Sequence, residues 1–513
     1  MTVGLSFYTF SKIYEVKTLD ENDFDIFVIG GGINGAGILR DAAGRGYKCG
    51  LAEMGDFGSA TSSSSTKLFH GGLRYLESYQ FRLVKESLRE RDLLLNLMPH
   101  ISWPVKFILP HNKNLRPYWI LRLGLYIYDL LAGSTKLSKS VGINLRNNTV
   151  GSCLDKSYTR GLAYTDCWVE DSRLVLLNIL DAEKKGAKAF SYSRVTNVQR
   201  KNGHWLVSIK SKDRSFEVKT KVLINTMGPW VNSLSQLEKN KNNQVMVRLI
   251  KGSHIVVKKL FNHDSAYIFQ GKDGRIIFSI PYENDFTLIG TTEVEHKMGN
   301  EVKCSDEEKD YLCNFASGYF QKKITEKDIV WDYSGVRALY ENKNVEARNA
   351  SRDYSFQIEE KEGAVLLIVY GGKITTYRKL AEKAVSKITA LLNLKRKEWT
   401  AIKHLPGGGF KLEDKEKLIV GILKKYKFLN RDWAERLFKT FGTDVEKVLG
   451  KAKEKKDLGR SFGSDLTERE VLWYINQEHA RCVEDLIWRR SKLGLRLSSK
   501  QVRELNSYIK KLN

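Results

Sequence analysis

The chain has 513 residues, of which 42% are hydrophobic and 11% aromatic, so it holds enough material for about three domains with real cores. This composition excludes an intrinsically disordered protein. The net charge of +25 favours an anionic partner, namely phospholipid, nucleic acid or an anionic substrate, although a lysine-rich solvated surface explains it equally well.

The spacing of cysteine and histidine excludes two further classes of protein. The six cysteines are scattered without a C-x-x-C pair, which is typical of a reducing compartment and not of a disulfide framework. The histidines show no metal-ligand spacing, so we expect no metal site. No window approaches the ~18 uninterrupted apolar residues of a spanning helix. Residues 1–22 lack the apolar core of a signal peptide, so we expect a short N-terminal extension on a protein kept inside the cell.

The strongest local pattern runs from residue 24 to residue 53. Apolar runs at 25–29 and 47–52 predict two buried parallel strands, and the second ends at Glu53. A predicted helix over 33–43 lies between them and is opened by glycines in G-x-G-x-x-G spacing, Gly30, Gly32 and Gly35. Such glycines let the backbone approach a pyrophosphate, while the helix N-terminus supplies N–H groups. The pattern indicates a dinucleotide site, and a Glu53 carboxylate on the ribose hydroxyls disfavours NADP.

Residues 60–67 form a run of small hydroxyl side chains directly after the predicted ribose-binding strand. Runs of this composition are usually flexible linkers. Here the small side chains and free N–H groups can also line a pyrophosphate and flavin edge, so linker and cofactor loop are equally open.

Further along, two helices precede the next strands. Residues 79–97 have helical periodicity with many charges. Residues 118–131 predict an apolar helix, and between a protein core and a membrane interface we favour the core. Strand patterns then follow at 189–198, 205–209 and 221–226, with a glycine turn at Gly228 that can close over a cofactor.

The second half of the chain changes character twice. Short β runs between residues 245 and 333 predict a mostly antiparallel domain inserted into the cofactor domain. A buried strand at 364–370 then leads through two glycines into another helix. Residues 405–409 read as a linker, and the remainder reads as helical throughout, without strand runs.

With these elements in place, the chain resembles the FAD-dependent, quinone-linked glycerol-3-phosphate dehydrogenases. The resemblance runs from residue 25 to the C-terminus and is carried by several separate blocks. These are GGGINGAG at 30–37, DAAGRG at 41–46, ATSSSSTKLFHGGLRYLE at 60–77, KGSHIVV at 251–257, IGTTEVE at 289–295, YSGVR at 333–337 and TTYRKLAE at 375–382.

The resemblance implies an α/β fold with a glutathione-reductase-like FAD-binding Rossmann domain, an inserted antiparallel β substrate domain and a C-terminal α-helical domain. We assign residues 23–85, 150–235 and 335–395 to the discontinuous FAD domain, 86–149 with 236–334 to the substrate domain, and 404–513 to the helical domain.

The reaction implied is oxidation of sn-glycerol 3-phosphate at C2 to dihydroxyacetone phosphate, with hydride passing to flavin N5. The substrate phosphate is a dianion that guanidinium groups bind bidentately. The resemblance supports Arg74, Arg337 and Arg352 for this role, with Tyr75 as a hydroxyl donor and Thr291 and Thr292 on substrate oxygens.

Loss of hydride also requires a base for the C2 hydroxyl proton. His254 and His70 are the candidates, because neutral imidazole accepts a proton near pH 7. Lys373 can polarise the developing carbonyl or stabilise reduced flavin, and Arg337 can stabilise the alkoxide but is a poor base. The helix that opens at Thr375 presents N–H groups to the flavin edge where negative charge appears.

The resemblance extends the set of predicted FAD contacts to both sides of the fold. The set comprises Gly30, Gly32, Gly35, Glu53, Thr61, Ser62, Ser63, Ser65, Lys67, His70, Gly71, Gly228, Gly372, Lys373, Thr375 and Thr376.

Electron transfer to membrane quinone implies peripheral attachment to an anionic membrane, which for this family is the inner face of the bacterial cell membrane. The positive charge and the helix at 118–131 are compatible with that location, and a homodimer is left open. The alternative enzyme is a flavin-dependent amino-acid oxidase of the same fold, but three arginines suit a phosphate dianion better than a carboxylate. A nucleic-acid-binding protein is disfavoured, because the chain lacks a recognisable module or a compact basic stripe.

Overall fold

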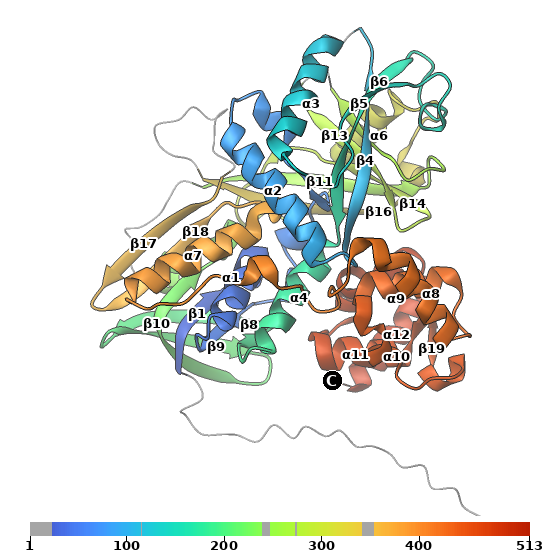
Figure 1. The fold of residues 1–513 in the computed structure, drawn as a ribbon. Coiled ribbons are helices and arrows are strands. Elements are labelled where there is room, and N and C mark those ends of the chain that lie inside the picture. Colours follow the sequence, from blue (N-terminus) through green and yellow to red (C-terminus); the bar gives the residue numbers. More distant parts are fainter. Residues whose placement is uncertain (1–22, 114, 239–246, 272–273, 341–352, 513) are drawn as a thin grey trace, which may run out of the picture.

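The structure is a computed structural model that describes residues 23–113, 115–238, 247–271, 274–340 and 353–512. The N-terminal extension at 1–22 and the substrate-site candidate Arg352 lie outside these residues. Two large sheets and a C-terminal helical domain make up the described part, as Figure 1 shows. The predicted fold class is confirmed.

The first sheet has a parallel centre flanked by antiparallel strands. Its strands, in spatial order, are β17 (Ser355–Lys361), β18 (Ala364–Tyr370), β10 (Ser215–Asn225), β1 (Asp23–Ile29), β2 (Cys49–Ala52) and β7 (Lys188–Phe190). β9 (His204–Ser211) also pairs with β10, and β8 (Ser193–Lys201) pairs with β9. In the central strands Ile29 pairs with both Ala52 and Asn225, and Asn225 with Ile368. The carboxyl ends of these strands therefore meet at one edge, where doubly wound folds bind ligands.

Helices cover the first sheet and complete its core. They are α1 (Ile33–Gly44), α4 (Asp171–Glu183) and α7 (Tyr377–Leu391). Apolar residues of α1 pack with those of α4 and α7 in one buried cluster. Because β1 and β2 are buried on both faces, they read as continuous apolar runs, which is why the sequence located them correctly.

The second sheet has ten strands and is mostly antiparallel, as predicted. Its strands, in spatial order, are β15 (Val294–Glu295), β11 (Val247–Lys258), β14 (Phe286–Gly290), β13 (Ile276–Tyr282), β12 (Ala266–Gln270), β4 (Ser102–His111), β6 (Arg160–Val169) and β3 (Leu68–Phe69), with β16 (Ile329–Tyr340) beside β11 and β5 (Val141–Asn144) beside β6. The pair of β4 and β12 is parallel. β6, which the sequence analysis placed with the FAD segments, pairs with β4 along its whole length and so belongs to this sheet.

The helices α2 (Phe81–Leu97), α3 (Tyr118–Ala132) and α6 (Asp306–Ser317) accompany the second sheet and its connections. The short helix α5 (Ser233–Leu237) instead packs on the first sheet, where Leu234 joins an apolar cluster of that sheet. The sequence analysis favoured a core position for the helix at 118–131, and this prediction is wrong for the exposed face of α3. Leu125 and Tyr128 are buried, but Trp119 is 67% exposed and Leu130 is 69% exposed. No helix in the described ranges is long and apolar enough to cross a bilayer.

The C-terminal domain has its own apolar core, built by α8 (Lys415–Lys425), α9 (Arg431–Phe441), α10 (Val445–Leu449), α11 (Glu468–Glu478) and α12 (Ser499–Leu512). A short hairpin, β19 (Ser461–Gly463) with β20 (Leu466–Thr467), corrects the prediction of an all-helical remainder. The runs were too short to show a period of two. A π-helix at Asp485–Arg490 lies between α11 and α12. The predicted linker is packed, because added side-chain atoms at Gly407 would collide with the backbone of Phe441.

Candidate functional site

The glycine turn after β1 is built for close backbone approach. Gly30 has φ of +106°, and a Cβ there would lie 2.7 Å from the carbonyl oxygen of Thr226. A Cβ at Gly35 would lie 2.0 Å from the Gly30 oxygen. The Thr226 hydroxyl donates to the carbonyls of Ile29 and Gly30 at 2.9 and 3.0 Å and so fixes the turn from β10. Only glycine fits at these positions, and the absence of side chains lets a ligand approach the backbone closely at the start of α1.

Glu53 directly follows β2 at the same edge of the sheet. Its carboxylate accepts hydrogen bonds from the N–H groups of Gly31 at 2.6 Å and of Gly55 at 2.8 Å. Burial raises the pKa of Glu53, and these hydrogen bonds oppose that shift. The predicted position of an acidic group at the end of the second strand is therefore matched by the geometry.

The hydroxyl-rich run at 60–67 is a packed loop, so the linker interpretation is wrong. The Ser62 hydroxyl accepts from the N–H of Ile33, the first residue of α1, at 2.9 Å. The Thr61 hydroxyl donates to the carbonyl of Val336 in β16 at 2.5 Å. The carbonyl of Ser63 accepts from the Lys67 ammonium at 3.2 Å. This loop joins the two sheets at the glycine turn, as a cofactor loop would.

The far end of this loop is held by a buried ion pair that the sequence analysis missed. Asp171, the first residue of α4, accepts from the Lys67 ammonium at 2.7 Å, and neither side chain is exposed. The same carboxylate accepts from the N–H and hydroxyl of Ser65. Burial alone would raise the pKa of Asp171, but the Lys67 charge lowers it below its usual range. Lys67 therefore positions the loop. The sequence analysis missed Asp171 because an acidic residue at the start of a helix is common and gives no distinctive signal.

The start of α7 closes the site from the opposite side. The Thr375 hydroxyl accepts from the N–H of His70 at 3.3 Å, which joins α7 to the strand β3 segment. Gly372 has φ of +99°, and a Cβ there would lie 3.0 Å from the side-chain nitrogen of Asn34. Asn34 donates to the Gly371 carbonyl at 3.0 Å, while its buried Oδ1 accepts no hydrogen bond from any described residue. Asn34 is a second residue that the sequence analysis missed, although it lies within GGGINGAG.

The remaining predicted FAD contacts differ in their surroundings. Thr376 is buried at the beginning of α7. Gly228 begins a short turn after β10, with φ of +55° and open space where a Cβ would stand. The Gly71 N–H donates to the Tyr128 hydroxyl at 2.8 Å and is thereby used within the protein.

His254 in β11 is a buried residue of the second sheet that faces the hydroxyl-rich loop. Its Nε2 is 3.0 Å from the Thr66 hydroxyl, and its ring stacks on Tyr333 with centroids 4.8 Å apart. Burial, with the Arg337 and Lys67 charges, lowers the pKa of His254 to about 3. The buried Nδ1 has no hydrogen-bond partner among described residues. The imidazole is therefore neutral at pH 7, as a proton acceptor must be.

Arg337 lies in β16, beside the strand that carries His254. Its guanidinium approaches the Thr291 hydroxyl at 3.5 Å and the Glu293 carboxylate at 3.6 Å. Thr292 is engaged elsewhere, because its hydroxyl accepts from the N–H of Ser253 and donates to Glu308. Thr291 is thus the threonine whose hydroxyl accompanies Arg337.

The Lys373 ammonium lies 3.6 Å from the centroid of the Tyr75 ring. This cation–π contact brings the α7 segment against the segment that follows β3. The side chain of Arg74, the neighbour of Tyr75, lies outside the described part of the structure.

The geometry suits FAD. A glycine cradle, a terminal glutamate, a helix N-terminus and two ordered loops face the same edge of the parallel sheet. The buried Asn34 Oδ1 accepts no hydrogen bond from a described residue, so it is available to accept one from the cofactor. The open space at Gly228 leaves room for the cofactor beside the glycine turn. No described group of histidine, cysteine or acidic residues has the arrangement of a metal site.

Two family models match the chain. The model described as FAD dependent oxidoreductase matches residues 25–378, and the model described as C-terminal domain of alpha-glycerophosphate oxidase matches residues 399–510.

Individual relatives are similar along nearly the whole chain. Aerobic glycerol-3-phosphate dehydrogenase of Escherichia coli (strain K12) is 42% identical, over 94% of this chain and 97% of the relative. D-erythritol 1-phosphate dehydrogenase of Brucella abortus (strain 2308) is 41% identical, over 92% of this chain and 95% of the relative. The solved structure of glycerol-3-phosphate dehydrogenase from Bacillus halodurans complexed with FAD has a TM-score of 0.75 at 26% identity, and it covers 96% of this chain and 94% of that one.

Proposed function

The chain belongs to the FAD-dependent oxidoreductase family that includes the glycerol-3-phosphate dehydrogenases, and from this premise we propose that it oxidises sn-glycerol 3-phosphate at C2 to dihydroxyacetone phosphate. FAD held at the glycine turn and at Glu53 would supply the hydride acceptor for this oxidation and the route by which electrons reach membrane quinone. The observation that carries the proposal is the placement of Arg337 and His254 on the paired strands β16 and β11, with His254 3.0 Å from Thr66 of the hydroxyl-rich loop.

Arg337 is the group that selects a phosphate. Its planar fork of donors matches two phosphate oxygens, and the Thr291 hydroxyl beside it supplies a further hydrogen-bonding group. The distance of 3.6 Å to Glu293 is longer than a close ion pair, so an arriving dianion competes for the guanidinium. Arg74 and Arg352 remain proposed partners of Arg337 from the family resemblance.

His254 is the favoured proton acceptor. The Arg337 and Lys67 charges act with burial to hold its pKa low, so the side chain does not enter the reaction already protonated. A dianionic substrate on Arg337 offsets part of that positive field and makes the imidazole a stronger base when the C2 hydroxyl arrives. Thr66, which bonds to Nε2, orients the ring. His70 remains the second candidate.

Lys373 and the N-terminus of α7 supply positive potential on the opposite side of the site. The Lys373 ammonium is held over the face of the Tyr75 ring. A cation and helix N–H groups in this position stabilise negative charge that develops at the carbonyl or on the cofactor edge.

A second candidate substrate is D-erythritol 1-phosphate, because a relative named for it is 41% identical, almost the same as the glycerol-3-phosphate dehydrogenase at 42%. The two compounds share the phosphate that Arg337 is proposed to bind and differ in chain length. Turnover of the holoenzyme is measured with both phosphates and with amino acids, with an artificial dye as the electron acceptor. This assay distinguishes the candidate substrates. We expect the highest kcat/KM with glycerol 3-phosphate, whereas preferred turnover of erythritol phosphate or of an amino acid would overturn the proposal.

We also propose peripheral attachment to the inner face of the bacterial cell membrane through α3. Five large apolar side chains of this helix are exposed, namely Trp119, Ile120, Leu123, Tyr126 and Leu130. Figure 1 places α3 at the end of the molecule opposite β8 and β9. An amphipathic helix of this kind can lie in the headgroup region, and the net charge of +25 favours anionic lipid. Such contact supports delivery of electrons to a membrane quinone.

A further inference from the structure

The loop that follows β2 is gripped by the C-terminal domain. Asp56, three residues after Glu53, accepts from Arg490 through Nη1 at 2.6 Å and through Nη2 at 2.7 Å. It also accepts from Arg489 Nε at 2.5 Å. The Asp56 side chain has no exposure and that of Arg490 only 1%. A buried bidentate arginine–carboxylate pair fixes both position and orientation, because two parallel hydrogen bonds must be satisfied together.

Asp56 sits between the two contacts that tie this loop to the cofactor edge. On one side, the Gly55 N–H donates to the Glu53 carboxylate at 2.8 Å. On the other side, the Gly58 N–H donates to the carbonyl of Gly31 in the glycine turn at 2.9 Å. Two glycines in so short a loop make its ordering entropically costly. The hydrogen bonds of Arg489 and Arg490 to Asp56 therefore restrain the position of Glu53, the residue proposed to hold the ribose.

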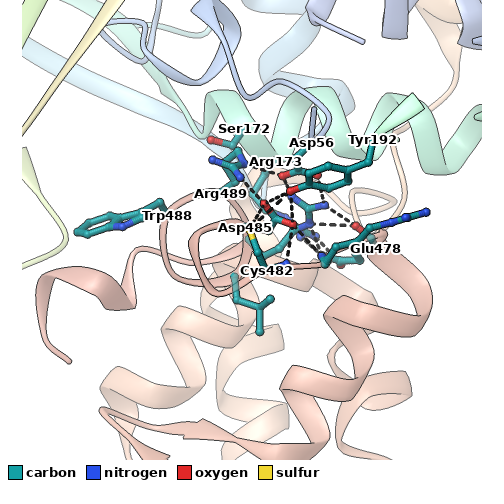
Figure 2. A network of polar contacts seen from close by, with 12 residues as sticks. Asp56, Ser172, Arg173, Tyr192, Glu478, Cys482, Asp485, Trp488 and Arg489 are labelled. Atoms are coloured by element: carbon teal, nitrogen blue, oxygen red, sulfur yellow. Dashed lines mark hydrogen bonds and ion pairs between the residues drawn. The ribbon is translucent and has the colours of Figure 1, made fainter. Parts of the chain in front are cut away.

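A second contact supports the same loop from the side. The Tyr192 N–H donates to the Gly55 carbonyl at 2.8 Å, and the Tyr192 hydroxyl donates to Asp485 at 2.8 Å. Asp485 and Arg489 bond to each other across one turn of the π-helix, as Figure 2 shows. The tyrosine and both π-helix residues thus form one network with Asp56.

The start of α4, which holds the hydroxyl-rich loop, is contacted by the same C-terminal segment. Lys492 is buried, and its ammonium lies 3.4 Å from the Ser172 hydroxyl at the start of α4. The preceding residue, Asp171, holds Ser65 and Lys67. Next along α4, Arg173 forms a buried pair with Glu478 of α11 at 2.5 and 3.1 Å (Figure 2). Residues 478–492 therefore restrain the loop after β2 directly and restrain the hydroxyl-rich loop through the start of α4.

We propose that the C-terminal domain holds the two FAD loops in their binding conformation, with Arg490 and Arg489 as positioning residues for the loop that carries Glu53. FAD retention is then a property of two domains, although the glycine fingerprint and Glu53 belong to one. The grip acts by preorganisation, since it orders the loop before the cofactor arrives and lowers the entropic cost of binding. The inference rests on the FAD site of the proposed function and not on the choice of substrate.

The test measures FAD affinity of the apoprotein by titration with flavin fluorescence as the readout. The variants are Arg490→Met and Arg489→Met, and the matched control is Arg436→Met. Arg436 makes the same bidentate pair with Glu470, at 2.6 and 2.9 Å, but inside the C-terminal domain and away from both loops. We expect Kd for FAD to rise at least about tenfold in the two test variants, equivalent to ~1.4 kcal/mol, and to stay near the parental value in the control.

Excess FAD provides a further readout. A positioning residue changes affinity and not chemistry, so turnover of Arg489→Met at saturating FAD should return to the parental value. If Arg490→Met does not fold, Arg489→Met decides, because its side chain is 16% exposed and less enclosed. Parental FAD affinity in the test variants, or an equal loss in Arg436→Met, would overturn the inference. Parental protein that binds FAD but leaves glycerol 3-phosphate unoxidised would instead refute the proposed function alone.

Discussion

Replacement of Lys67 by methionine tests whether this residue positions the hydroxyl-rich loop or contacts the cofactor itself. Its ammonium is fully buried, 2.7 Å from Asp171 and 3.2 Å from the Ser63 carbonyl. From these contacts we expect a positioning role. Lys67→Met keeps most of the side-chain volume and removes only the charge and its hydrogen bonds.

The expected cost follows from what Asp171 retains. Loss of one partner of a buried ion pair typically costs about 3–5 kcal/mol. Four donors still serve the Asp171 carboxylate, namely the N–H and hydroxyl of Ser65 and the N–H and hydroxyl of Ser172, so the lower end applies. We expect the free energy of unfolding to fall by about 3 kcal/mol in Lys67→Met. With Asp171→Asn added, no uncompensated charge remains, and we expect a net loss of only about 1 kcal/mol.

Denaturant unfolding and FAD titration of the parent, both single variants and the double variant complete the cycle. If Lys67 acts through the loop, the double variant recovers both stability and FAD affinity relative to Lys67→Met. Equal loss of FAD affinity in Lys67→Met and in the double variant would refute this reasoning, because it would mean that the ammonium binds the cofactor directly.

Three further predictions concern the substrate site, acid stability and the membrane. Arg337→Lys should raise KM for glycerol 3-phosphate at least about tenfold and leave the flavin content at the parental value, since one ammonium cannot replace the fork of donors of a guanidinium. Unchanged steady-state kinetics would exclude Arg337 from the phosphate site. Between the folded-state pKa of about 3 for His254 and the unfolded value near ~6.5, only the unfolded chain binds a proton, so stability falls as pH drops. Lowering pH from 7 to 5 should cost about 2 kcal/mol through His254, and His254→Gln should remove that part of the slope in denaturant unfolding; an unaltered slope would contradict it. Leu123→Ser with Leu130→Ser should reduce co-sedimentation with anionic vesicles, while Ile402→Ser, at a 74% exposed residue outside α3, should not; equal binding by all variants would exclude α3 as the contact.

Local patterns predicted the parts of the site whose conformation depends on neighbours in sequence. The strand, glycine turn and helix at 23–44 form from one short segment, so spacing alone located Gly30, Gly35 and the edge at Glu53. The hydroxyl-rich loop was left open because its conformation depends on Asp171, 106 residues away from Ser65. Composition carries no information about such a distant partner.

The exposure of α3 and the contact of Asp56 with Arg490 likewise depend on elements that are distant in the sequence. Helical periodicity groups residues on a face but does not reveal whether another element covers it, so α3 was assigned to the core while Trp119 and Leu130 are exposed. Asp56 and Arg490 are 434 residues apart and are each unremarkable in sequence. Only the docking of the C-terminal domain on the FAD domain makes them a pair.

The most direct test of the central claim is the absorbance spectrum of the purified protein before and after anaerobic addition of glycerol 3-phosphate. We expect an oxidised flavin spectrum that the substrate bleaches, because FAD bound at the glycine turn would take up the hydride of glycerol 3-phosphate held at Arg337. A flavin spectrum that glycerol 3-phosphate leaves unchanged, or a colourless protein that FAD does not reconstitute, would contradict the account.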